Sequence, residues 1–68
     1  TITAKVKEAL ISDPQVKARQ VHVETMNGVV QLSGFVDSAS NEARAVRLAE
    51  QVKGVKNVHD NMNIRSPR

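Results

Sequence analysis

The sequence predicts an α+β domain with αββαβ order, in which two helices pack on one face of a three-stranded sheet that we expect to be mixed. The first observation is residues 21–36, where apolar and polar side chains alternate on both sides of Asn27-Gly28. Alternation is typical of strands, and an Asn-Gly pair between two such runs is typical of a type I′ hairpin turn. The second observation is that apolar residues recur at helical spacing before and after this hairpin. Because each hairpin arm has one apolar face, we expect the helices to cover it.

The first helix is predicted over residues 1–12, with Thr1 or Thr3 as its N-cap residue. Its apolar stripe consists of Ile2, Val6, Ala9 and Leu10. Pro14 disfavours a helical conformation at the residue before it, so the helix is expected to end near that point. The connector that follows would place Val16 at an edge of the core.

The hairpin divides its side chains between the two faces of the sheet. The face toward the helices is predicted to carry Val21, Val23, Thr25, Val30, Leu32, Gly34 and Val36. The open face would carry three large apolar residues: Met26, Val29 and Phe35. If these three formed one contiguous patch, it would indicate a partner or a neighbouring domain.

The second helix is predicted to begin with Asp37 or Ser38 as its cap, to carry Glu42 in its first turns, and to run to about Val52. Its core-facing stripe consists of Ala45, Leu48, Ala49 and Val52, with Val46 on the flank. Gly54 is expected directly after the helix, as a C′ residue with positive φ.

The third strand is predicted over residues 55–64. Its apolar face consists of Val58, Met62 and Ile64. Asp60 shares that face, so we expect a bulge or a strand end there. The sequence leaves open whether this strand pairs beside the second strand (mixed sheet) or the first (antiparallel sheet), and we favour the mixed sheet. We divide the chain into a single domain, residues 1–64, and a polar C-terminal linker, residues 65–68.

Composition argues against several classes of protein. The 68 residues carry a formal charge of +3, no cysteine and a single aromatic residue, Phe35. A mild charge without stacking aromatics argues against a nucleic-acid reader. The lack of cysteine removes disulfides and thiolate metal sites, and no apolar run approaches the roughly 18 residues of a transmembrane segment.

Residue types that serve catalysis or metal binding are present, but not in a recognisable motif. His22 and His59 fall one on each of two strands, so we interpret them as solvated surface histidines and not as metal ligands. Ser33 or Ser38, with a histidine and Asp37, would supply the residue types of a hydrolase triad, but triads are defined by geometry. We therefore predict no enzyme, no metal and no cofactor.

Four segments together resemble the BON domain, a family of bacterial osmotically inducible and nodulation proteins. The most specific are the glycine-ended second strand, residues 27–34, and the Gly-Val-x-x-Val of residues 54–58; residues 2–10 and 21–25 complete the likeness. The resemblance covers nearly the whole chain. It implies a non-enzymatic module of the bacterial envelope, periplasmic and linked to osmotic stress, that docks on phospholipid membrane surfaces. It also implies a sister BON domain or envelope proteins as partners, and backbone roles for Gly28, Gly34 and Gly54.

Four cations are the candidate lipid-binding residues: Arg44, Arg47, Lys53 and Lys56. A basic side chain near an anionic membrane contributes about 1 kcal/mol of binding free energy. The alternative is a protein–protein interaction or chaperone-like module that uses the open sheet face. Salt separates the two, because screening weakens docking by charge and leaves apolar docking intact.

Overall fold

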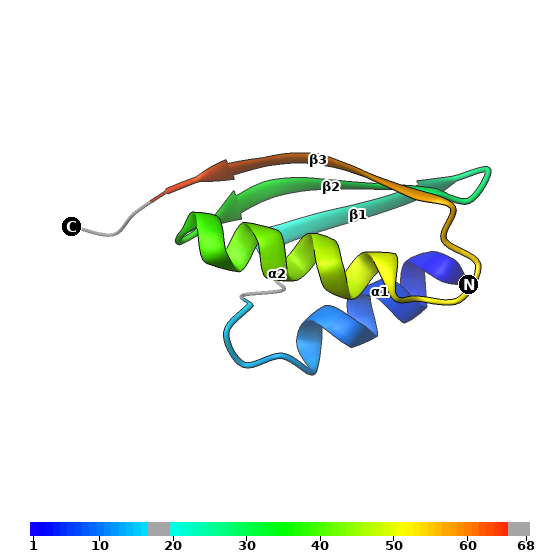
Figure 1. Ribbon diagram of the computed structural model, residues 1–68, viewed down its shortest axis with the longest axis horizontal. Coiled ribbons are helices and arrows are strands. Elements are labelled where there is room, and N and C mark those ends of the chain that lie inside the picture. Colours follow the sequence, from blue (N-terminus) through cyan, green and yellow to red (C-terminus); the bar gives the residue numbers. More distant parts are fainter. Residues whose placement is uncertain (17–19, 66–68) are drawn as a thin grey trace.

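A computed structural model describes residues 1–16 and 20–65 of the chain, and within them the predicted order of elements is confirmed (Figure 1). The elements are α1 (Ile2–Ile11), β1 (Val21–Met26), β2 (Val29–Val36), α2 (Ala39–Glu50) and β3 (Asn57–Ile64). Both helices lie on the same side of the sheet, which leaves its other face open (Figure 1). Residues 17–19 of the predicted connector and residues 66–68 of the predicted linker lie outside the described residues.

The three strands form a mixed sheet in the order β1-β2-β3, as favoured from the sequence. β1 and β2 pair antiparallel, with Val23 opposite Leu32, and β2 and β3 pair parallel, with Val30 opposite Val58. The parallel pairing follows from the crossover through α2, because the helix carries the chain back to the end of the sheet where β2 begins. The turn between β1 and β2 has positive φ at both Asn27 (52°) and Gly28 (81°), as a type I′ turn requires.

The core is aliphatic and lies between the helices and the sheet. Its buried members are Val6, Leu10, Val16, Val21, Val23, Val30, Leu32, Val36, Ala45, Ala49 and Met62. Val16 is among them, which confirms its predicted place in the core. Ala45 and Ala49 have no exposed surface, so these small side chains allow α2 to lie close to the strands beneath it.

Hydroxyl side chains cap the first turn of each helix. Thr1 Oγ1 accepts from the Ala4 N–H at 3.1 Å, and Ser38 Oγ accepts from the Asn41 N–H at 3.1 Å. These contacts satisfy amide groups that have no partner within the helix. They select Thr1 and Ser38 from the alternatives that the sequence offered.

The positive φ predicted for Gly54 is confirmed, but the prediction that Gly54 directly follows the second helix is wrong. α2 ends at Glu50, because the next turn tightens: the Val52 N–H bonds to the Ala49 carbonyl, three residues back, at 3.2 Å. Gly54, with φ of +98°, instead lies in a turn closed by the Val55 N–H and the Val52 carbonyl at 3.2 Å. This is the third position of a β-turn, where a type II turn also needs positive φ.

The predicted bulge or strand end at Asp60 is also wrong. β3 pairs with β2 without interruption from Asn57 to Ile64, two residues shorter at its start than predicted. Asp60 keeps its place on the helix side of the sheet because β3 is an edge strand, and there the carboxylate remains exposed to water. Its Oδ1 also accepts from the Met62 N–H at 2.9 Å, which satisfies part of the carboxylate locally.

Candidate functional site

The four predicted cations do not form one cluster. Arg44 lies in the middle of α2, Arg47 in its last turn, Lys53 in the turn that follows, and Lys56 directly before β3. All four side chains are exposed. The structure separates them into Arg44, which is paired, and the other three, which form no ion pair with any residue in the described ranges 1–16 and 20–65.

Arg44 forms an ion pair with Asp13, in the loop after α1. The Arg44 Nε donates to Asp13 Oδ2, and the Gln15 N–H donates to Asp13 Oδ1 at 2.9 Å. Asp13 is only 8% exposed, and these donors hold its pKa below the ordinary value. The Arg44 hydrogen bond is the main cause, the Gln15 bond adds to it, and burial partly opposes both. Arg44 therefore ties the α1 loop to α2, and its charge is largely offset.

This pair predicts how stability depends on pH. Folding lowers the pKa of Asp13 from its ordinary value of 3.8. Its contribution to the free energy of unfolding is therefore fully present above pH 3.8 and is lost as pH falls through the lower pKa of the folded chain. Replacing Asp13 with Asn should therefore destabilise the chain near pH 7, and the difference from wild type should shrink below about pH 4. Thermal unfolding followed by circular dichroism between pH 2 and pH 7 measures both proteins. A difference that stays constant over this range would contradict the role of the Asp13 carboxylate.

Glu42 titrates in the opposite sense. A hydrogen bond with Asp60, followed by burial and the repulsion between the two carboxyl groups, raises the pKa of Glu42 above its ordinary value of 4.5. The folded chain therefore holds this proton more tightly than the unfolded chain does, and stability falls as pH rises from 4.5 through the raised value. The pH dependence of wild-type stability therefore combines the contributions of Asp13 and Glu42. The difference between wild type and Asp13→Asn at each pH isolates the contribution of Asp13.

Lys56 packs against the hairpin turn between β1 and β2. Its N–H donates to the Gly28 carbonyl at 2.7 Å, and a Cβ placed on Gly28 would lie 2.9 Å from Lys56 Cγ. Lys53 lies in the same α2–β3 connection, and both this connection and the hairpin turn are at one end of the molecule (Figure 1). We call this region, residues 26–29 and 53–56, the hairpin end.

Two apolar side chains are exposed at the hairpin end. Met26 is 75% exposed and Val29 is 38% exposed, and they are partners across the last pair of the β1–β2 ladder. The sequence grouped them with Phe35, and the structure corrects this. Phe35 lies near the far end of β2, where the Arg65 guanidinium carbon stands 5.4 Å from its ring centroid. Six residues of strand, roughly 20 Å, separate Phe35 from Val29.

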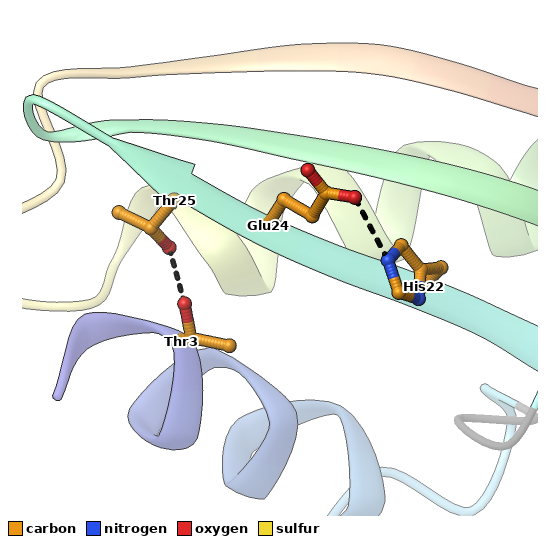
Figure 2. Close-up of polar contacts among 4 residues, drawn as sticks. All are labelled: Thr3, His22, Glu24 and Thr25. Carbon is orange, nitrogen blue, oxygen red and sulfur yellow. Dashed lines mark hydrogen bonds and ion pairs between the residues drawn. The ribbon is translucent and has the colours of Figure 1, made fainter.

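The open face of the sheet beside the hairpin end is slightly hollowed. A concavity of about 490 Å³ is lined by Glu24, Thr25, Met26, Asn27, Val29, Gln31 and His59. His22 Nε2 lies 3.0 Å from Glu24 Oε1 on this face (Figure 2). On the other face, Thr3 Oγ1 donates to Thr25 Oγ1 at 2.8 Å and joins α1 to β1 (Figure 2).

The histidines and serines considered for metal binding or catalysis lie on the strands and at the start of α2. His22 and His59 are exposed on β1 and β3, and among the described residues no group of three or more His, Cys, Asp or Glu side chains comes together to hold a metal. Ser33 lies within β2 and Ser38 caps α2. In the described ranges, no helix is long and apolar enough to cross a membrane.

Two features of the site were not predicted from the sequence. The Asp13–Arg44 pair joins residues 31 positions apart, and only the packing of the α1 loop on α2 brings them together. The contact of Lys56 with Gly28 depends on the β2–β3 register, which pairs Val29 with Asn57. The mixed sheet was favoured from the sequence, but its register was not given by any local pattern.

Comparison with known proteins assigns the chain to a family. The BON domain profile matches residues 1–66. The chain is 42% identical over 67 residues to Osmotically-inducible protein Y of Escherichia coli (strain K12), and the match covers 98% of this chain and 33% of that protein. The chain thus spans about a third of the length of this relative. A match over nearly the whole chain, together with the αββαβ fold, shows that it belongs to the BON domain family.

Proposed function

We propose that this chain is a non-catalytic, periplasmic module of the bacterial envelope that docks on anionic phospholipid surfaces. Its membership of the BON domain family supports a membrane-associated module. Its likeness to Osmotically-inducible protein Y supports a link to osmotic stress and a place in the envelope. The observation that carries the proposal is the set of exposed cations that have no described ion-pair partner and lie at or near the hairpin end: Arg47, Lys53 and Lys56.

The charge of this region favours an anionic surface. Residues 47–56 contain these three cations and one carboxylate, Glu50, so this segment carries a net charge of 3 − 1 = +2. Each cation within reach of an anionic membrane contributes about 1 kcal/mol. Arg44 contributes less than the sequence suggested, because Asp13 already holds its guanidinium.

A protein partner on the open sheet face is the second candidate function. The observation in its favour is the concavity of about 490 Å³, which places the exposed Met26 and Val29 beside polar groups such as His59. A client protein or a sister BON domain would bind there through apolar contact, and salt would affect that contact little. Because this concavity includes Met26 and Val29 of the hairpin end, the test must separate charge from apolar contact.

Reversing Arg47 and Lys53 to glutamate tests the lipid proposal. The two changes take the formal charge from +3 to −1 and remove two attractive contacts of about 1 kcal/mol each. Binding to anionic vesicles should therefore weaken at least about 30-fold, measured by co-sedimentation. The fold should hold, because both side chains are exposed.

The matched control is the reversal of Lys5 and Lys7 to glutamate on α1. Both residues are exposed and the formal charge again falls from +3 to −1, so only the position of the change differs. The control should lose much less binding than the Arg47/Lys53 variant. Equal losses would mean that net charge alone drives docking, and would remove the hairpin end and the end of α2 from the proposed surface.

A further inference from the structure

The two large apolar side chains at the hairpin end have no role in the core. Met26 has the largest exposed fraction among the large hydrophobic residues described, 75%, and Val29 is 38% exposed beside it. They are partners across the last pair of the β1–β2 ladder, so they form one small apolar surface beside the turn. The charged docking proposed above does not use either residue, which leaves this surface for a second, apolar contact.

The hairpin end holds these side chains in a fixed position. Met26 and Val29 form the last pair of the β1–β2 ladder, and the turn between them has the backbone angles of type I′. The 2.7 Å bond from Lys56 to the Gly28 carbonyl fastens the turn to the α2–β3 connection. The Lys56 side chain packs against Gly28, so a basic residue lies at the turn that joins the apolar pair.

The neighbouring charges select the occupant. Lys53 and Lys56 lie in the connection packed against the turn, so a complementary partner combines an apolar layer with negative charge beside it. Two side chains are too few for a stable protein interface, which buries roughly 800 Å² on each partner. A bilayer needs no matching surface of that size, and its phosphates lie directly above its hydrocarbon.

We infer that the hairpin end is an insertion element, in which Met26 and Val29 enter the hydrocarbon of an anionic bilayer while Lys53 and Lys56 contact its phosphates. The domain then docks end-on, with the sheet and both helices standing away from the membrane. This inference rests on the proposed function and adds to it the part of the lipid that is contacted and the orientation of the bound domain.

Single tryptophan reporters test the insertion, because the chain has no tryptophan or tyrosine of its own. Met26→Trp places the probe at the hairpin end. Ile11→Trp is the matched control, since Ile11 is 71% exposed and ends α1. α1 begins beside Gly54, because a Cβ built on Gly54 would lie 3.2 Å from Ile2 Cδ1. The ten residues of α1 then place Ile11 roughly 15 Å from this end.

Vesicles of phosphatidylglycerol and phosphatidylcholine, with brominated acyl chains in a second set, provide the readout. The Met26→Trp emission should shift to shorter wavelength and be quenched by bromine, while the Ile11→Trp emission should remain that of a solvated probe. Co-sedimentation of the same samples reports how much protein is bound. Bound Met26→Trp protein without shift or quenching would overturn the insertion and leave lipid docking standing. A larger effect at Ile11 would assign insertion to α1 instead.

Serine substitutions measure the apolar contribution itself. Met26→Ser should weaken vesicle binding by about tenfold or more, because the side chain loses its transfer into hydrocarbon. Ile11→Ser should leave binding within about twofold of wild type. Neither change should lower the melting temperature, because both side chains are exposed. Equal binding of the two serine variants would overturn the inference. Absence of vesicle binding by the wild type would overturn it together with the proposed function.

Discussion

Replacing Leu32 with alanine is expected to cost about 2–5 kcal/mol of the free energy of unfolding. Leu32 has no exposed surface and lies in the central strand, opposite Val23 of β1. Truncation removes apolar contacts and leaves a cavity that the surrounding aliphatic side chains refill only in part. A chain of 68 residues has a total stability of roughly 3–10 kcal/mol, so this variant is expected to be close to unfolded at room temperature.

Urea denaturation followed by circular dichroism measures this cost. The control is Gln31→Ala, one residue earlier on β2, where the side chain is exposed on the open face. It should change the free energy of unfolding by no more than about 0.5 kcal/mol. If both variants lost the same stability, Leu32 would not be the centre of the core and the β2 register would be wrong.

Replacing Gly34 with alanine is expected to cost at least about 2 kcal/mol, from backbone strain and steric overlap together. Gly34 has φ of +115°, a conformation that a residue with a Cβ avoids. A Cβ at this position would also lie 2.1 Å from the Gln20 carbonyl oxygen, which is backbone and has little freedom to move. The start of β1 would therefore have to separate from β2.

The matched control for this variant is Ser33→Ala, the preceding residue of the same strand. Ser33 is half-buried and its change to alanine adds no atoms, so we expect a loss below about 1 kcal/mol. A Gly34→Ala protein with the melting temperature of this control would contradict the close approach of Gln20 to β2.

The fold was predictable because its signals are local and agree with one another. The alternation in the hairpin, the Asn27-Gly28 turn and the helical stripes each specify one element, and the lengths of the connections leave few ways to join them. Errors arose where a tertiary contact decided the outcome. Asp60 was expected to break the strand, but the open edge of β3 lets its carboxylate reach water.

The candidate site was predictable only in part. Arg47, Lys53 and Lys56 are exposed, as expected for cations outside the apolar stripe. The neutralisation of Arg44 was not predictable, because it depends on where the α1 loop carries Asp13. The contact of Lys56 with Gly28 was also missed, since these residues, 28 positions apart, meet only through the parallel register of β2 and β3.

The central claim is that this domain docks on anionic phospholipid through charge, and co-sedimentation of the wild-type chain with vesicles tests it most directly. The series varies the anionic fraction of the vesicles and the ionic strength from about 0.01 M to about 1 M, over which the Debye length falls from roughly 30 Å to roughly 3 Å. We expect binding that increases with anionic lipid, weakens steeply with salt, and is weak on neutral vesicles. No binding to any vesicle, or equal binding to neutral and anionic vesicles at every salt concentration, would contradict the claim and leave the open sheet face as the candidate surface.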